Sequence, residues 1–264
     1  MFKDITLGQY FPADSIIHKL DPRMKLLLLF VLIIGVFFAI TPIQYAIFIL
    51  FTLVLVFLTK IPLKLYLKSF KPIFWLAVFT GSLNLFLTRG GTVLFNYNDI
   101  IVITELGVNM AVTMLLRLFL LITISSTLTY TTSPIALSGS MEAMLSPLKK
   151  IKFPAHEVAM MMSIALRFIP TLIDEVDIIV KAQTARGANF NTGSLIKRIK
   201  ALIPLLLPLF ISAFRRAEDL ATAMEARCYN GGEGRTSYKI MKYESTDFVA
   251  LAICALVVVA VVII

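Results

Sequence analysis

Two arginines are the side chains of this chain best suited to binding a partner. Arg186 and Arg227 lie 41 positions apart, and each stands between an alanine and a small residue at the expected end of a long helix. The two copies read Ala185-Arg186-Gly187 and Ala226-Arg227-Cys228. A single copy would be an ordinary helix end, where arginine complements the helix dipole and glycine caps the last turn. Two copies favour docking, because an exposed arginine can form a bidentate pair with a carboxylate in a partner's groove.

Other residue patterns that could do chemistry are absent from the sequence. No G-x-x-x-x-G-K-[ST] motif occurs, so ATP binding through a P-loop is not expected, and the glycine-rich run at 231–236 lacks the required lysine. His18 and His156 are far apart, which argues against a metal site. Serines and acids show no nucleophile–base arrangement. We therefore expect no catalytic site, no cofactor and no metal.

The composition indicates an integral membrane protein. The chain has 264 residues, of which 58% are hydrophobic and 16% are charged, and its mean hydropathy is +0.87. Soluble domains carry about 25% charged residues, so this composition does not fit one. In so apolar a chain, the net charge of +9 is expected to face the cytoplasmic side of a membrane rather than nucleic acid. Two cysteines, Cys228 and Cys254, provide no disulfide framework.

The apolar segments predict five transmembrane helices. The 34 uncharged residues between Lys25 and Lys60 are too many for one span, and Thr41-Pro42 divides them because a residue before proline avoids helical geometry. Asp21 and Pro22 suit the N-cap and the first position of the first helix. The predicted spans cover residues 24–40, 43–59, 72–88, 106–130 and 248–264.

Basic residues in the short connections predict the orientation. The segment before the first span carries Lys3, Lys19, Arg23 and Lys25, and the second connection carries Lys60, Lys64, Lys68 and Lys71 with no acid. The other two connections are uncharged or slightly acidic, so the amino terminus is expected inside and the carboxyl terminus outside. A cleaved signal peptide is not expected, because acids interrupt the N-terminal segment.

A charged insertion separates the fourth and fifth predicted spans. Residues 131–247 hold 15 of the 25 basic residues and 11 of the 16 acidic ones. They contain two long helical patterns, at 155–185 and near 194–227, the first with an apolar stripe at steps of four and three. The uncharged stretch 201–214 is too short for a sixth span and predicts a buried or interfacial helix. We thus predict an all-α integral membrane protein, with spans in 1–130, a cytoplasmic helical domain at 131–246 and a last span at 247–264.

Further motifs accompany the arginine endings. They are Gly8-Gln9-Tyr10, Asp14-Ser15, the stretch from His18 to Leu26 and, around the second ending, the stretch from Ala223 to Gly232. Together with Ala185-Arg186-Gly187, these motifs resemble the transmembrane T component of energy-coupling factor (ECF) transporters, a branch of the ABC importers for vitamins and transition-metal ions. The resemblance covers nearly the whole chain. The second arginine ending has Cys228 where the family often has glycine, so a small side chain is retained.

The resemblance implies a non-catalytic coupling subunit in a bacterial plasma membrane. Members of the family join two cytoplasmic ATPases to a separate membrane subunit that captures the substrate. The long helices would be coupling helices, with Arg186 and Arg227 each docking into one ATPase. The two-arginine ending favours a coupling module that is shared by several substrate-capture proteins over one that belongs to a single dedicated transporter.

Two other functions fit the residues less well. A stand-alone secondary transporter or channel usually places ionisable residues near the bilayer midplane, on broken helices or internal repeats. Here the clearly intramembrane charge is Arg117, which could reach Asn84 or Ser82 or lie nearer the cytoplasmic edge. An integral membrane enzyme would need a carboxylate or histidine cluster at the membrane face, and the sequence has none.

Overall fold

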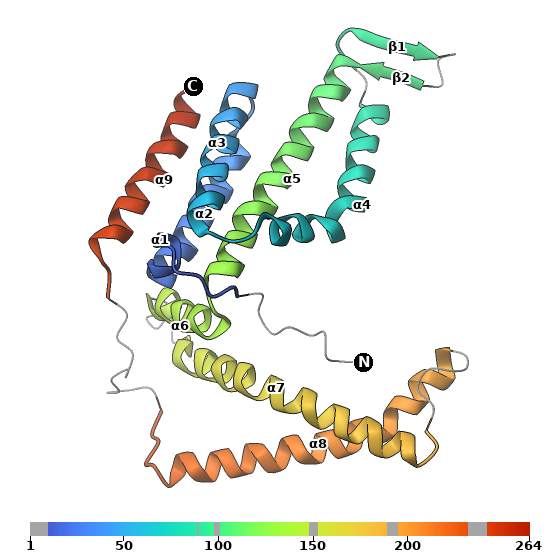
Figure 1. Cartoon of the computed structure of the whole chain (residues 1–264), viewed down its shortest axis with the longest axis vertical. Helices are drawn as coiled ribbons and strands as arrows, with labels where there is room; N and C mark the ends of the chain where they lie inside the picture. The colour runs from blue at the N-terminus through green and yellow to red at the C-terminus, as the bar shows by residue number, and fades with distance from the viewer. Residues whose placement is uncertain (1–9, 89, 98–100, 148–152, 189–194, 232–241) are drawn as a thin grey trace. The chain divides into compact units, whose positions relative to one another are not determined.

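The structure is a computed structural model that describes residues 10–88, 90–97, 101–147, 153–188, 195–231 and 242–264. These residues form two compact units (Figure 1). The first, here called the membrane unit, combines the described residues up to Ser140 with those from 242 onward. The second, here called the insert unit, contains the described residues between 141 and 231.

The membrane unit is built almost entirely of helices. Four of its helices are long and apolar enough to cross a membrane, and α2, with 17 residues, is slightly shorter. The all-α membrane fold is thereby confirmed, while five spans remain a prediction. Its helices are α1 (Ile16–Lys19), α2 (Pro22–Phe38), α3 (Pro42–Thr59), α4 (Leu63–Leu87), α5 (Glu105–Thr131), α6 (Pro134–Leu145, which extends past the boundary between the units) and α9 (Ser245–Ile263).

Capping residues fix where the first two long helices begin. The Asp21 carboxylate accepts a hydrogen bond from the backbone N–H of Arg23 at 2.8 Å, and Pro22 occupies the first turn, as predicted. Thr41 and Gln44 form a reciprocal capping box at the start of α3, so the predicted break at Thr41-Pro42 is confirmed. The Gln44 amide also donates to the carbonyl of Val261 at 2.8 Å, which ties α3 to α9.

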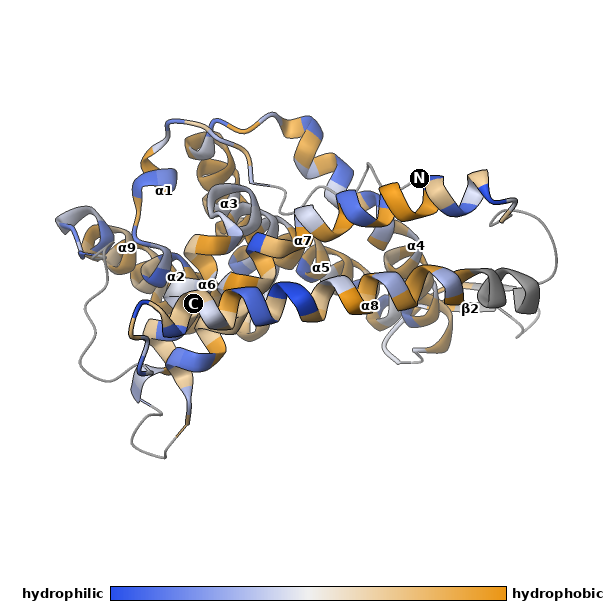
Figure 2. Cartoon of the chain, turned by 90° about the horizontal axis from the view of Figure 1, so that it is seen from below, coloured by the Kyte–Doolittle hydropathy of each residue, from blue (hydrophilic) through white to orange (hydrophobic). Residues whose placement is uncertain are grey.

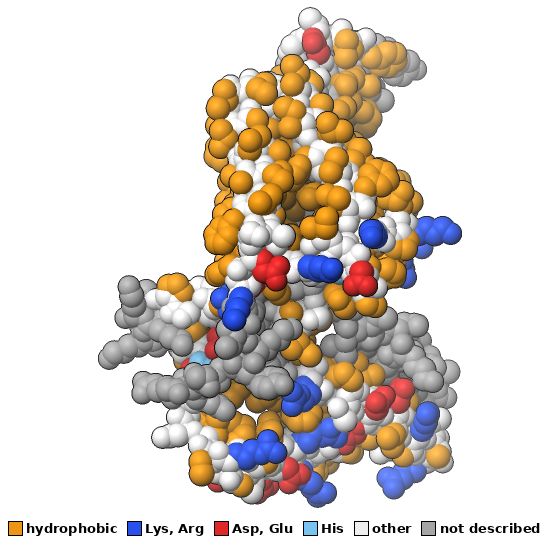
Figure 3. Space-filling view, turned by 60° about the vertical axis from the view of Figure 1, so that its left-hand side comes forward, with side chains coloured by type: hydrophobic (Ala, Val, Ile, Leu, Met, Phe, Trp, Pro, Cys, Tyr) orange, Lys and Arg blue, Asp and Glu red, His pale blue; other side chains and the backbone are white. Residues whose placement is uncertain are grey.

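The core of the membrane unit lies where α2, α3, α5 and α9 run side by side (Figure 1). Gly35 allows a close approach of α9 to α2, because a Cβ at this position would lie 2.7 Å from Cγ2 of Val258. The core residues are Leu28, Leu32, Val36, Ala39, Tyr45, Phe48, Leu120, Ile124, Cys254 and Val261. On the face drawn in Figure 3, hydrophobic side chains cover most of the surface between the two ends of this unit.

The α4 region differs from the prediction in two ways. The helix begins at Leu63 rather than Pro72, so Lys64, Lys68 and Lys71 lie on a helix and not in a connection. Pro72 lies inside the helix, where it removes a backbone hydrogen bond, and Figure 1 shows α4 bent between its two halves. The connection after α4 forms an antiparallel hairpin of β1 (Val93–Tyr97) and β2 (Ile101–Thr104), which the sequence reading missed.

Arg117 closes the carboxyl end of α2 instead of binding Asn84 or Ser82. Its Nη2 donates to the carbonyl of Ala39 at 3.3 Å and to the Tyr45 hydroxyl at 3.1 Å. Asn84 and Ser82 fail as partners because each donates to a carbonyl of its own helix. A cation at a helix carboxyl end complements the helix dipole, so Arg117 has a structural role here.

The insert unit consists mainly of two helices of equal length. They are α7 (Ala155–Ala185) and α8 (Leu195–Glu225), each of 31 residues, and α7 has the predicted bounds. Figure 2 shows hydrophobic and hydrophilic residues alternating along α7 and α8.

Candidate functional site at the arginine ends of two crossed helices

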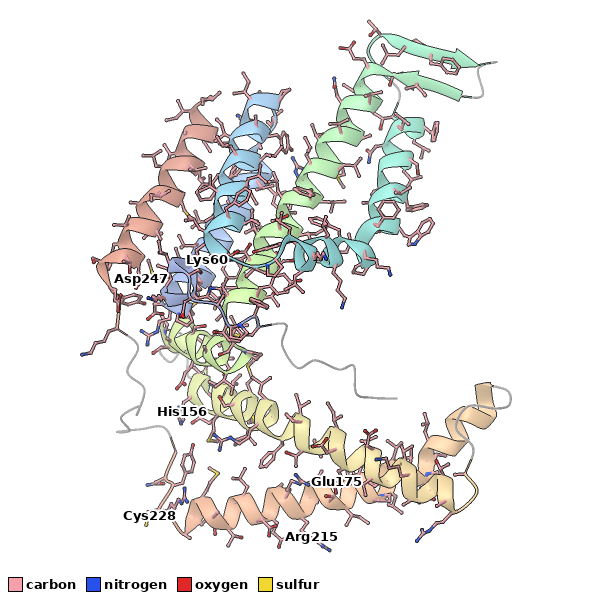
Figure 4. All side chains as sticks on the ribbon, viewed as in Figure 1. Lys60, His156, Glu175, Arg215, Cys228 and Asp247 are labelled. Atoms are coloured by element: carbon pink, nitrogen blue, oxygen red, sulfur yellow. The ribbon has the colours of Figure 1, made fainter. Side chains whose placement is uncertain are left out.

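The helices α7 and α8 cross at a contact between two charged side chains. Nη2 of Arg216 donates to Oε2 of Glu175 at 2.8 Å, and the guanidinium lies 6.0 Å from the centre of the Phe168 ring. Both side chains are partly buried, at 30% and 22% exposure, so water screens this pair less than a surface pair. In Figure 4 the labelled Glu175 lies where the two ribbons meet. The charge-assisted hydrogen bond fixes where along their lengths the helices touch.

Apolar side chains complete the crossing. A pocket of about 250 Å³ beside the ion pair is lined from α7 by Ile164, Phe168 and Leu172, and from α8 by Ala213, Arg216, Ala217, Leu220, Ala221 and Met224. The sequence predicts an apolar stripe on α7, and of the α7 residues at the pocket only Leu172 belongs to it. The predicted stripe consists of Val158, Met162, Ala165, Ile169, Leu172, Val176 and Ile179. Small alanines on α8 opposite larger side chains on α7 allow the helices to approach closely.

Each long helix ends in the same backbone motif. After α7, the N–H of Gly187 donates to the carbonyl of Thr184 at 3.0 Å, and the N–H of Ala188 donates to that of Gln183 at 2.9 Å. This pair of hydrogen bonds defines a Schellman motif, with Arg186 as the C-cap residue and Gly187 in the left-handed conformation at φ +89°.

The end of α8 repeats that motif with cysteine in place of glycine. The N–H of Cys228 donates to the carbonyl of Glu225 at 2.9 Å, and the N–H of Tyr229 donates to that of Met224 at 3.0 Å. Cys228 has a φ of 55°, so it takes the left-handed conformation that Gly187 takes after α7. For a residue with a Cβ this conformation costs roughly 1–2 kcal/mol. The residue after each arginine therefore has to adopt a positive φ as well as be small.

The arginines of both endings are available to a partner. All six predicted docking residues, Ala185, Arg186, Gly187, Ala226, Arg227 and Cys228, are exposed. Within the described part of the chain, the ion pairs are Glu175–Arg216 and Glu142–His156, and neither includes Arg186 or Arg227. Among the residues that the structure describes, neither guanidinium has a carboxylate partner, so its donors can pair with an acidic group on another protein.

The two endings do not form one joint site. Because α7 and α8 cross in opposite directions, their carboxyl ends lie on opposite sides of the crossing (Figure 1), and Figure 4 labels Cys228 at the end of α8. Arg186 follows Glu175 by 11 residues, and Arg227 follows Arg216 by 11 residues. At 1.5 Å per residue, each arginine lies about 16 Å along its helix from the ion pair. The geometry thus presents two equivalent, exposed arginine ends, each the same number of residues from the crossing.

The contact that sequence reasoning missed is the ion pair itself. Glu175 and Arg216 are separated by 41 positions, the same spacing as the two arginine endings. That shared spacing was the available signal, since it makes Glu175 and Arg216 equivalent positions of two similar helices. Among the described residues, no three His, Cys, Asp or Glu side chains are grouped so that they could hold a metal ion.

An apolar helical membrane unit, together with a unit of two crossed helices that end in exposed arginines, defines an all-α membrane protein. Comparison with known proteins then gives the family. The family model described as "CbiQ: Cobalt transport protein" matches residues 13–238, and the chain belongs to this family.

Curated relatives agree over almost the full length. The chain is 52% identical to the energy-coupling factor transporter transmembrane protein EcfT of Ruminiclostridium cellulolyticum, over 96% of this chain and 94% of that one. It is 51% identical to the protein of the same name from Clostridium kluyveri, over 99% and 96% of the two chains. The Bacillus subtilis protein of that name is 46% identical, over 94% and 93%. The chain is thus a membrane component of the ECF transporter type.

Proposed function

We propose that this chain is the coupling subunit of an ECF importer. In this function it joins two cytoplasmic ATPases to a separate membrane protein that captures a vitamin or another micronutrient. Arg186 and Arg227 each dock into one ATPase, and α7 and α8 carry the motion of the ATPases toward the membrane unit. ATP hydrolysis belongs to the partners in this proposal, because the chain has no P-loop motif.

The single observation that carries the proposal is the equivalence of the two helix ends. Both arginines are exposed C-cap residues of Schellman motifs, and both lie 11 residues beyond the Glu175–Arg216 contact. A symmetric pair of ATPases needs two docking points of the same local shape on a single asymmetric chain. Two matched arginine ends meet that need, whereas a stand-alone transporter or channel has no use for them.

The crossing supports a mechanical role. When two docked ATPases approach each other, they apply forces at the carboxyl ends of α7 and α8. Each end acts through a lever about 16 Å long on a crossing that the ion pair and its apolar surroundings hold together. Displacement at the ends is then transmitted as rotation of the helices about the crossing rather than absorbed by bending.

The proposal is tested by charge reversal at each docking arginine. Arg186→Glu and Arg227→Glu are each expected to reduce co-purification of one ATPase and to abolish ATP-dependent uptake, because the arginine can no longer pair with a carboxylate. Arg215→Glu is a matched control, since Arg215 is an exposed arginine of α8 away from either end. Normal uptake by both end variants, at wild-type membrane levels, would refute the docking role.

The orientation belongs to the same proposal. With the ATPases in the cytoplasm, the amino terminus is expected in the cytoplasm and the carboxyl terminus outside. A tag at each terminus, probed with an impermeant reagent in intact cells, tests this arrangement. Labelling of the N-terminal tag in intact cells would contradict it.

A further inference from the structure

The first part of α4 carries a lysine face that the docking function does not use. We call the segment Leu63–Lys71 the basic arm; it follows the exposed Lys60, which ends α3 and is labelled in Figure 4. Lys64, Lys68 and Lys71 recur at steps of four and three, which places them on one face of the helix. The sequence contains no aspartate or glutamate between Asp21 and Asp99, so no acid near in sequence neutralises this face.

Packing on α5 holds the basic arm in a fixed rotation. Tyr66 is 4% exposed, and its hydroxyl lies 3.2 Å from the hydroxyl of Thr127. The Tyr130 hydroxyl donates to the carbonyl of Leu65 at 3.0 Å. The ring of Phe70 stacks on Phe119 with 4.7 Å between the ring centres. Because this side of the arm is buried, the lysines are held on the outer side.

The outer side has a lysine sector and an apolar sector next to each other. Lys64, Lys68 and Lys71 are exposed, and no ion pair between described residues includes them. Leu63 and Leu67 are also exposed, at 55% and 67%, and lie along one edge of the lysine sector. An exposed apolar edge beside a row of lysines is typical of a helix that lies in the interface between lipid headgroups and acyl chains.

The bend at Pro72 allows this placement. Figure 1 shows the basic arm running crosswise to α5, while the rest of α4 runs along α5 toward the β hairpin. A crosswise arm that precedes a membrane-crossing segment lies at the level where that segment enters the bilayer. Just after the bend is Trp75, which is 77% exposed and is the only tryptophan of the sequence. Tryptophan is enriched at this level of membrane proteins.

We propose that Lys64, Lys68 and Lys71 form a binding site for the headgroups of anionic phospholipids in the bilayer. The phosphate of a lipid such as phosphatidylglycerol accepts hydrogen bonds from the lysine ammonium groups. Its acyl chains lie against Leu67 and the exposed aromatic residues that follow Pro72. Basic residues beside a transmembrane helix attract acidic lipids in this way, and lysine stems can follow the apolar surface while their charges reach the phosphates.

The single tryptophan supplies a direct test on the full-length chain. The purified chain is reconstituted in phosphatidylcholine vesicles that contain a minor fraction of either brominated phosphatidylglycerol or brominated phosphatidylcholine. Bromine on an acyl chain quenches a tryptophan that it contacts, so quenching of Trp75 reports which lipid occupies the adjoining position. Brominated phosphatidylglycerol is expected to quench Trp75 at a lower mole fraction than brominated phosphatidylcholine, by a factor on the order of tenfold. This difference between the two lipids should become smaller in high salt.

Three variants separate a local site from general attraction. The triple variant K64Q/K68Q/K71Q is expected to lose the preference. A control variant, K19Q/K181Q/K242Q, removes the same net charge from three exposed lysines elsewhere and is expected to keep it. The variant K64R/K68R/K71R retains the charges and is also expected to keep it, which guards against loss through misfolding. Inorganic phosphate added at constant ionic strength should leave the quenching unchanged, because the ligand is a lipid.

Several results would overturn the proposal. One is equal quenching by both lipids in the wild-type chain, and another is an undiminished preference in K64Q/K68Q/K71Q. A preference lost equally in the control variant would show that net charge rather than the basic arm attracts the lipid. If the wild-type chain showed no lipid preference, the inferred partner of the lysine face would be an acidic protein surface instead of a lipid.

Discussion

Glu175 and Arg216 form a 2.8 Å ion pair at equivalent positions of two 31-residue helices, 11 residues before the two exposed arginines Arg186 and Arg227. The pair therefore marks where α7 and α8 touch, and the two exposed arginines lie equally far along their helices from that contact. If α8 slipped along its own axis by one turn, the distance from the contact to Arg227 would change by about 5 Å, whereas the distance to Arg186 would stay the same.

The ion pair can be tested by exchanging its charges. Glu175→Arg and Arg216→Glu are each expected to impair uptake and to destabilise the chain by about 1–3 kcal/mol, because each places two like charges at a partly buried contact. The double variant restores opposite charges and should recover much of both losses. Uptake and thermal unfolding of all three variants form a double-mutant cycle; additive losses in the double variant would show that the pair does not couple the helices.

Backbone conformation at the two helix ends gives opposite expectations for two small substitutions. Cys228→Gly is expected to stabilise the end of α8 by about 1 kcal/mol, because glycine adopts a positive φ without the cost of a Cβ. Gly187→Ala should destabilise the end of α7 by a similar amount. A Cβ at Gly187 would meet no atom within 4 Å, so a steric clash would not explain that loss. Hydrogen exchange of the amides at both ends measures the effect, and equal protection in all variants would contradict it.

How much the sequence predicted depended on whether a local signal marked each feature. Pro154 and Gly187 flank α7, and its predicted bounds were correct; Asp21 and Thr41 likewise marked the starts of α2 and α3. The predicted start of α4 at Pro72 was wrong, because a proline is compatible with a helix start and also with a kink inside a helix. Only the packing of Tyr66 on α5 shows that the helix begins before it.

Features that depend on distant contacts were not predictable in the same way. The partners of Arg117 lie at Ala39 and Tyr45, about 70 to 80 positions away, and a single sequence does not show that α5 lies against the end of α2. The six residues that we predict to dock stand out in the sequence because their pattern is local and repeated. That Arg186 and Arg227 lie equally far from the crossing follows only from the structure, which shows the contact between Glu175 and Arg216.

Arg117 is expected to contribute to stability. Arg117→Met keeps the length of the side chain but removes the donor to Ala39 and Tyr45, which leaves the carboxyl end of α2 with one partner fewer. The expected loss is about 1–3 kcal/mol, the range for hydrogen bonds from a charged group. The midpoint of thermal unfolding in detergent measures it, with the exposed Arg167→Met as a control of equal chemistry. Equal midpoints for both variants would argue against the structural role.

The last prediction concerns acid sensitivity at the N-terminal segment. Burial lowers the pKa of His18 below its usual 6.5, and the positive charge of Lys25 acts in the same direction, while the backbone carbonyl of Phe11 and the carboxylate of Asp14 oppose it. The neutral ring is well accommodated, because Nε2 lies 3.0 Å from the carbonyl of Phe11 and Nδ1 lies 2.6 Å from the Ser15 hydroxyl. The folded chain thus binds this proton less tightly than the unfolded chain.

From this difference the sign of the pH dependence follows. The stabilising contribution is complete above the unfolded pKa of about 6.5 and is lost as the pH falls through that value toward the lower pKa of the folded state. His18→Gln should therefore flatten the decline of the unfolding midpoint between about pH 7 and about pH 5. His156→Gln, which replaces the other histidine of the chain, should retain the decline attributable to His18. If the slope were the same in His18→Gln as in the wild-type chain, the loss would originate at other titratable groups instead.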